Sequence, residues 1–156
     1  MQTNLAPEYA DRAEGQAAEA ILRKCVHCGF CTATCPTYQL LGDELDGPRG
    51  RIYLIKQMLE GETPTRKTQS HLDRCLTCRN CESTCPSGVQ YGHLVDIGRK
   101  LVDEKVERPL GERLLRSALK EGLPSKMFGP AMKLGQSVRA ILPEALKAKV
   151  PVKQAA

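Results

Sequence analysis

All eight cysteines of the chain belong to one pattern, and the chain contains that pattern twice. The first copy is CVHCGFCTATCP at residues 25–36, and the second is CLTCRNCESTCP at residues 75–86. In each copy two residues separate the first three cysteines, three residues separate the third from the fourth, and a proline follows. The copies are offset by 50 residues, and the match extends outward to Leu22 and Leu72. We therefore expect two similar cysteine-bearing loops related by an approximate local symmetry.

This spacing is typical of bacterial-type [4Fe–4S] binding, in which the fourth cysteine of each run ligates the other cluster when two are present. The first predicted ligand set is Cys25, Cys28, Cys31 and Cys85. The second predicted ligand set is Cys75, Cys78, Cys81 and Cys35. Because the sets cross, each cluster would join two segments far apart in sequence, and cluster binding would contribute to the free energy of folding. Such a contribution suits a chain with no tryptophan and only two phenylalanines.

Zinc and disulfides are the alternative explanations of the cysteines. A structural zinc site usually uses two separated C-x-x-C pairs, whereas each run here has a third cysteine three residues after the pair. The N-terminal residues MQTNLAPEYADRAEG lack the apolar stretch of a secretory signal, and no apolar run is long enough to span a membrane. We therefore expect a cytoplasmic protein, in which thiols stay reduced and metal ligation is the favoured role.

The residues around the cysteines have helical spacing, so we predict an all-α fold with the cysteines on loops. Four helices are expected in the first two thirds of the chain, at residues 12–24, 52–60, 71–74 (with Ser70 as its cap) and 91–107. Beyond Pro109 we expect short helices that are interrupted by prolines. No segment alternates polar and apolar residues as a strand would.

Charge divides the chain into two parts, a cluster domain at residues 1–108 and a basic helical tail at residues 109–156. The tail has nine Lys or Arg and three Glu, while the first part is nearly neutral. The tail is interpreted as solvated helices, or as a surface that docks on a partner or on anionic lipid. Two clusters, each with four thiolates around a 2+ core, would lower the formal net charge of +5 to about +1. No nucleic-acid partner is therefore expected.

Several other residues near the runs are candidates for contact with a cluster. His27 lies inside the first run and is interpreted as a loop residue or as a donor to a cluster sulfur. The segment GDELDGPRGR is expected to form the turn before Ile52, with Arg49 and Arg51 facing a cluster or a partner. We also expect the backbone N–H groups of Gly29 and Gly88 to donate to cluster sulfurs.

No catalytic residues are recognisable in the chain. It has no paired carboxylates, no Ser–His arrangement and no glycine-rich phosphate loop of the G-x-G-x-x-G type. A protein with two clusters and no substrate site of its own most simply passes single electrons from a two-electron donor, such as a flavin, to an acceptor. A cluster-stabilised structural or sensing module without electron transfer is the alternative.

Two segments resemble a known family. Residues 25–61 and 71–100 are similar to the iron–sulfur subunits of bacterial glycolate oxidase, also called glycolate dehydrogenase, and the likeness extends over residues 20–120. The cysteine runs alone also occur in the corresponding subunits of succinate, glycerol-3-phosphate, lactate and heterodisulfide oxidoreductases. The segments TYQLLGDELDGPRGRIYLIKQ and HLDRCLTCRNCESTCPSGV narrow the choice to glycolate oxidase.

The resemblance implies an α-helical ferredoxin domain with two [4Fe–4S] clusters, in a subunit of an oxidoreductase complex. In that family flavoprotein subunits, which are expected to carry the FAD, oxidise glycolate to glyoxylate. Electrons then leave through the iron–sulfur subunit toward a quinone-linked acceptor, with peripheral contact at the inner membrane. The family's subunit normally continues into a longer cysteine-rich half, whereas no cysteine follows Cys85 here, so we expect a truncated or split version.

Overall fold

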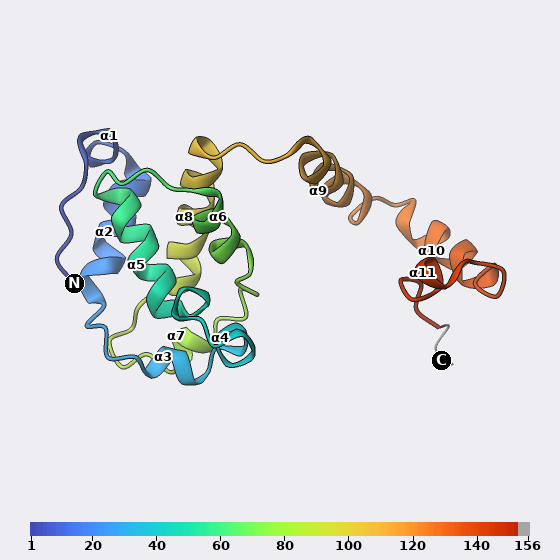
Figure 1. Cartoon of the computed structure of the whole chain (residues 1–156), viewed down its shortest axis with the longest axis horizontal. Coiled ribbons are helices and arrows are strands. Elements are labelled where there is room, and N and C mark those ends of the chain that lie inside the picture. The colour runs from blue at the N-terminus through green and yellow to red at the C-terminus, as the bar shows by residue number, and fades with distance from the viewer. Residues whose placement is uncertain (153–156) are drawn as a thin grey trace. The chain divides into compact units, whose positions relative to one another are not determined.

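The computed structural model describes residues 1–152, without the side chains of residues 145–146. Every regular element among the described residues is a helix, so the predicted all-α fold class is confirmed (Figure 1). The chain divides into two compact units, Met1–Glu107 and a second unit that starts at Arg108. No helix among the described residues is both long enough and apolar enough to cross a bilayer.

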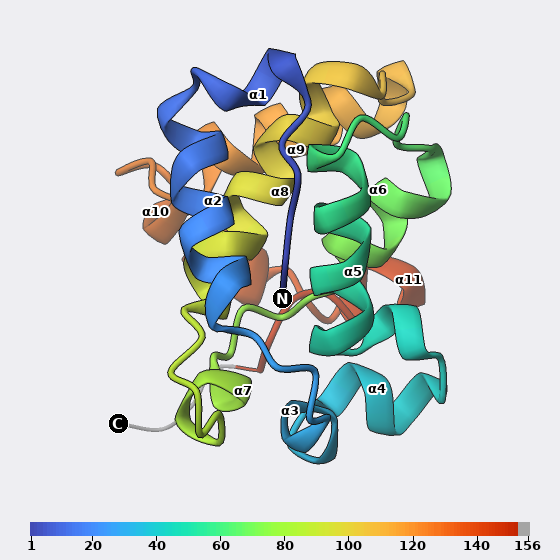
Figure 2. The ribbon, with the colours of Figure 1, turned by 90° about the vertical axis from the view of Figure 1, so that its left-hand side faces the viewer.

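The first unit contains eight α-helices and one 3₁₀ helix within its 107 described residues. They are α1 (Pro7–Ala10), α2 (Ala13–Lys24), α3 (Phe30–Ala33), α4 (Pro36–Leu41), η1 (Glu44–Asp46), α5 (Pro48–Leu59), α6 (Arg66–Asp73), α7 (Asn80–Ser83) and α8 (Tyr91–Lys105). The four longest, α2, α5, α6 and α8, pack around a common apolar core. The short helices α3, α4 and α7 lie together at one end of this bundle (Figures 1 and 2).

The core forms where the apolar faces of the long helices meet. Leu22 of α2, Ile55 of α5 and Leu94 of α8 are almost completely buried. The helices α5 and α8 approach closely at Gly98, where an added Cβ would lie 2.6 Å from Cγ1 of Ile55. A side chain at position 98 would therefore push these two helices apart.

The helices α2 and α8 begin and end close to the predicted positions, but α5 begins earlier than predicted. Residues 48–51 are the first turn of α5 and not a preceding turn, so that prediction was wrong. Pro48 occupies the first helical position, where its missing N–H has no consequence. Gly50 is required there because an added Cβ would lie 2.1 Å from the backbone oxygen of Glu44.

Helix α6 also begins earlier than predicted. Its N-cap is Thr65 and not Ser70, which lies inside the helix. The Thr65 hydroxyl accepts from the Thr68 N–H at 3.3 Å, and the Thr68 hydroxyl accepts from the Thr65 N–H at 3.2 Å. This reciprocal arrangement is a capping box with threonine in place of the usual glutamate or glutamine. The expected helix over 71–74 is thus the last turn of a longer helix.

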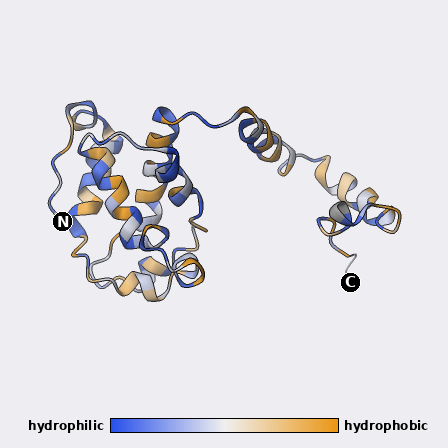
Figure 3. Cartoon of the chain, in the orientation of Figure 1, coloured by the Kyte–Doolittle hydropathy of each residue, from blue (hydrophilic) through white to orange (hydrophobic). Residues whose placement is uncertain are grey.

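The second unit contains α9 (Leu110–Gly122), α10 (Phe128–Ser137) and α11 (Glu144–Lys147). None of the described residues of α9 and α10 is buried. Figure 3 shows that apolar and polar residues both occur along α9. Leu114, Leu115 and Leu119 are exposed on this helix, together with the basic residues Arg113 and Lys120.

Candidate iron–sulfur site

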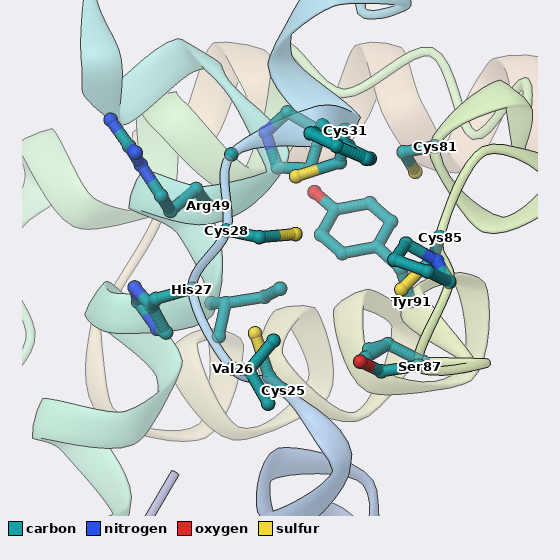
Figure 4. A pocket seen from close by; sticks show the side chains of 16 residues that line it. Cys25, Val26, His27, Cys28, Cys31, Arg49, Cys81, Cys85, Ser87 and Tyr91 are labelled. Carbon is teal, nitrogen blue, oxygen red and sulfur yellow. The ribbon is translucent and has the colours of Figure 1, made fainter.

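Two cavities lined by cysteines lie at the end of the bundle formed by α3, α4 and α7. The first measures about 440 Å³ including its opening to solvent. The sulfur atoms of the first predicted ligand set point toward this space (Figure 4), and the set comprises Cys25, Cys28, Cys31 and Cys85. Three of these cysteines come from the first run and one comes from the second run. The structure thus brings the first predicted set around one cavity.

The second cavity measures about 300 Å³ including its opening. Its cysteines are Cys35, Cys75, Cys78 and Cys81, which are the members of the second predicted set. Cys81 lines both cavities, and so does Tyr91, whose ring lies among the labelled cysteines of Figure 4. Pro48 also lines both, so the two cavities share a wall that contains one ligand candidate, one aromatic ring and one proline.

The two loops begin in the same way. Helix α2 ends at Lys24, and the Cys25 N–H donates to the Leu22 carbonyl at 3.0 Å. Helix α6 ends at Asp73, and the Cys75 N–H donates to the Leu72 carbonyl at 3.2 Å. Since both leucines are fully buried, each helix fixes the first cysteine of its run to the core.

The backbone then follows one path in both loops. His27 and Thr77 have φ values of 55° and 54°, and Gly29 and Arg79 have φ values of 86° and 60°. The left-handed conformation is strained for residues other than glycine, and it persists where the surrounding structure imposes it. Alternation of left- and right-handed residues points successive N–H groups into a concave surface that suits an anion or an iron–sulfur cluster.

One turn of helix follows each of these left-handed segments. Cys31 lies in α3 and Cys81 lies in α7, so the prediction that the cysteines lie on loops was wrong for these two. The prediction for Gly88 was wrong as well, because its N–H donates to the Cys85 carbonyl at 3.2 Å. Gly29 occupies the left-handed position that precedes α3, as the N-cap residue of that helix.

Burial and mutual repulsion disfavour the thiolate forms of these cysteines. Burial, followed by the charge of Cys25, raises the pKa of Cys31 to about 11. Burial, followed by the charge of Cys31, raises the pKa of Cys81 to about 12. Thiolates crowded in this way require a compensating positive charge. A cationic iron core would supply it, so the four thiols of each predicted ligand set fit a [4Fe–4S] cluster in donor type and number.

Hydroxyl groups approach two sulfurs of the second set. The oxygen Oγ1 of Thr37 lies 3.2 Å from Sγ of Cys35, and the Tyr91 hydroxyl donates to Sγ of Cys75 across 3.7 Å. Burial raises the pKa of Tyr91 well above its usual value, so the phenol stays protonated and remains a donor. Sequence reasoning missed both residues, although Thr37 directly follows the Cys-Pro that ends the first run.

The two arginines singled out in the sequence line different cavities. Arg49 borders the first cavity, while Arg51 borders the second and is fully buried. Arg51 donates to the His71 carbonyl at 2.7 Å and lies 3.4 Å from the carboxylate of Asp46. Asp46 also accepts from Arg74 at 2.9 Å, so this buried carboxylate lies between two guanidinium groups.

His27 lines the first cavity as a half-buried residue. Burial, followed by the charge of Arg49, lowers the pKa of His27, so the ring is neutral at pH 7. Its Nε2 is buried and has no hydrogen-bond partner among the described residues. The ring packs edge-on against Tyr53, with 6.5 Å between the ring centroids. The position agrees with the loop interpretation of His27 and keeps it next to the first cysteine set.

Residues 21–89 match the family model described as "4Fe-4S dicluster domain". The observed all-helical fold and the eight cysteines at two adjoining cavities agree with that description, so the class to which residues 21–89 are similar is a domain for two [4Fe–4S] clusters.

Two curated relatives make the resemblance specific. The chain is 62% identical over 152 residues to the "Glycolate oxidase iron-sulfur subunit" of Escherichia coli (strain K12), an alignment that covers 97% of this chain and 37% of that protein. It is 38% identical over 100 residues to the "Probable glycolate oxidase iron-sulfur subunit" of Bacillus subtilis (strain 168), over 63% of this chain and 22% of that protein. The resemblance predicted from the sequence is therefore confirmed, and the chain spans little more than a third of the length of the first relative.

Proposed function

We propose that this chain is the electron-transferring iron–sulfur part of a flavin-linked glycolate oxidase complex, which oxidises glycolate to glyoxylate. The observation that carries the proposal is the gathering of two crossed cysteine sets around adjoining cavities. That arrangement occurs in a chain that is 62% identical to a glycolate oxidase iron–sulfur subunit.

The first ligand set binds one cluster and the second ligand set binds the other. This assignment is supported by the two cavities, each of which is bordered by three cysteines of one run and the fourth cysteine of the other, with Cys81 also reaching the first cavity. Residues 1–108 form the cluster domain and residues 109–156 form the basic tail. The division of the structure after Glu107 supports this boundary.

The clusters, when bound, supply one-electron carriers that the protein's own side chains lack. The chain's residues bind them, orient them and exclude water from them. Cys25, Cys35 and Cys81 are buried, whereas Cys28 and Cys78 are exposed, so each site has one solvent-facing ligand. The wall of Pro48, Cys81 and Tyr91 that the two cavities share keeps the two sites adjacent, as stepwise electron transfer requires.

The partners in this proposal are flavoprotein subunits that carry FAD. Apolar side chains stand exposed beside the cysteines, with Val26 and Phe30 at the first run and Leu76 at the second. Exposed apolar groups around a functional site are typical of surfaces that contact other proteins. These residues therefore support docking of an electron donor or acceptor at this end of the bundle.

We further propose a cytoplasmic location with peripheral contact at the inner membrane, where a quinone-linked acceptor takes the electrons. Support comes from α9, on which exposed leucines and basic side chains occur together. Helices of that composition bind to the surface of anionic membranes.

The test is an anaerobic assay of the assembled complex. The full chain is purified together with its flavoprotein partners, analysed for iron and acid-labile sulfide, and mixed with glycolate. About eight iron atoms and eight sulfides per chain are expected, with bleaching of the cluster absorbance by glycolate. A complex in which Cys28 and Cys78 are both replaced by alanine is the matched control, and it should hold less iron and sulfide and show no bleaching by glycolate.

Reduction by glycerol-3-phosphate or lactate but not by glycolate would refute the substrate assignment. Zinc without sulfide would refute the electron-transfer function altogether. Clusters that no substrate reduces, but whose loss unfolds the chain, would indicate a structural module.

A further inference from the structure

The two cavities differ in the polar groups that reach their cysteine sulfurs. In the second cavity Oγ1 of Thr37 lies 3.2 Å from Sγ of Cys35, and the Tyr91 hydroxyl donates to Sγ of Cys75 across 3.7 Å. Within the described part of the chain, no side-chain hydroxyl makes such a contact with a sulfur of the first set. The hydroxyl–sulfur contacts are therefore specific to the second cavity, although the two cysteine runs repeat each other.

The hydroxyl of Thr37 is itself bound to a buried cation. Nη1 of Arg51 donates to Oγ1 of Thr37 at 3.1 Å, so the guanidinium is two hydrogen bonds away from Sγ of Cys35. The same hydroxyl lies 2.8 Å from the Asp46 carbonyl, and it can donate its single proton to that oxygen or to the sulfur. As a cluster ligand the Cys35 sulfur is a thiolate and can only accept. When the hydroxyl proton turns from the Asp46 carbonyl to this thiolate, Thr37 links the guanidinium to the sulfur.

The charge around Arg51 is positive overall. Asp46 lies 3.4 Å from Arg51 and 2.9 Å from Arg74, so one carboxylate faces two guanidinium groups. Nδ1 of His71 contacts the same carboxylate at 3.1 Å and adds no negative charge. Arg51 is 0% exposed, and a charge buried to that degree is poorly screened by water or salt.

The first cavity has a different electrostatic environment. Its arginine, Arg49, lies 2.6 Å from the carboxylate of Glu44, and the two side chains are 39% and 41% exposed. The pair is neutral overall, and solvent screens both of its charges. The field at the first cysteine set therefore lacks the buried positive charge that acts on the second.

We propose that the second ligand set holds the cluster of higher reduction potential, and that Thr37, Tyr91 and Arg51 produce the difference. The inference rests on the proposed function and its ligand sets. Each cluster takes up one electron from the reduced flavin donor, and its negative charge rises by one. Hydrogen bonds to the sulfurs and a nearby positive charge stabilise the reduced form more than the oxidised form, which raises the potential. Electrons would then move favourably from the first site to the second, which is the site nearer the acceptor in the electron path.

The experiment is a redox titration of the full chain under anaerobic conditions, followed by EPR. Thr37→Val removes the hydroxyl at constant shape, and Tyr91→Phe removes the phenol oxygen while it keeps the ring. Ser87→Ala is the matched control, because Ser87 occupies the position equivalent to Thr37 in the repeat and lines the first cavity. Variants of the two exposed ligands assign each EPR signal to a cluster. Cys28→Ser should alter the spectrum of the first cluster, and Cys78→Ser should alter that of the second.

We expect the wild-type signal assigned through Cys78 to have the higher midpoint potential. Thr37→Val and Tyr91→Phe should each lower that midpoint and leave the other unchanged, and Ser87→Ala should move neither. Arg51→Gln should lower it further than Thr37→Val does. If the Arg51 variant fails to fold, the two hydroxyl variants still decide the question.

A lower wild-type midpoint for the signal assigned through Cys78 would overturn the inference. Unchanged midpoints in both hydroxyl variants would overturn it too, as would a shift of the signal assigned through Cys28. These failures leave the proposed function intact as long as the chain holds two clusters that glycolate reduces. A chain that holds no clusters would refute both.

Discussion

The first cysteine site faces a solvent-exposed ion pair, whereas the second faces a fully buried arginine. The backbone of the two loops is nevertheless the same, with left-handed residues at His27 and Thr77 and again at Gly29 and Arg79. The repeated cysteine run therefore sets the ligand geometry, and the residues between the runs set the environment. Thr37, Asp46 and Arg51 all lie between the runs, and within the described residues the first cavity has neither a hydroxyl–sulfur contact nor a fully buried arginine in its lining.

The largest effect, the loss of one cluster, is expected from replacing the fourth cysteine of either run by alanine. Cys35→Ala should remove the cluster of the second site, and Cys85→Ala should remove the cluster of the first site, because each sulfur borders the cavity of the other run. Each variant should lose about half of its iron. EPR signals of the remaining cluster should be different in the two variants. Loss from the Cys25, Cys28 and Cys31 site in the Cys35 variant would contradict the crossed assignment.

The second comparison concerns the two arginines. Arg51→Met should destabilise the protein by about 3–5 kcal/mol, because it leaves the buried carboxylate of Asp46 with one fewer cation. Arg49→Met should cost about 0–1 kcal/mol, because its pair with Glu44 is exposed. Anaerobic denaturant unfolding of the cluster-loaded variants measures both values. Similar losses in the two variants would show that burial does not distinguish the sites.

The sequence predicted the ligand sets but not the groups around them. Cysteine spacing is a local signal, and it was sufficient here because three of the four predicted ligands in each set come from one short run. The contact between Arg51 and Thr37 joins residues 14 positions apart, and that between Tyr91 and Cys75 joins residues 16 apart. No local pattern indicates which hydroxyl will reach which sulfur, since that depends on how α4, α5 and α8 pack.

Helix positions show the same division between local and tertiary signals. The alanine-rich composition of α2 and the apolar spacing of α8 were sufficient to place these two helices. The start of α5 was missed because a glycine at position 50 is unfavourable in a helix, and its value appears only where the Glu44 backbone packs against it. The cap of α6 was missed because Thr65 and Thr68 cap the helix by a reciprocal hydrogen bond between threonines.

The smallest effect is expected from substitutions at the two left-handed positions that precede α3 and α7, which should change the unfolding free energy by different amounts. Gly29→Ala should destabilise the protein by about 1 kcal/mol, since alanine is strained at a φ of 86° and the end of Arg49 must also shift. Arg79→Gly relieves similar strain but removes the 2.8 Å contact of Arg79 with Glu82, a surface pair that contributes about 0.2–1 kcal/mol. The relieved strain and the lost ion pair nearly cancel, so the unfolding free energy of Arg79→Gly should stay close to that of the wild type.

Denaturant unfolding of the two variants at one cluster loading tests this contrast. A loss of more than about 1 kcal/mol in Arg79→Gly, above the surface-pair range, would mean that the pair with Glu82 outweighs the backbone strain. The structure would explain such a loss, because Glu82 also accepts a 2.5 Å hydrogen bond from the N–H of Gly92. The arginine would then hold the first turn of α8, and with it Tyr91, against the second site. The two loops would differ in how they are anchored as well as in the charges that they face.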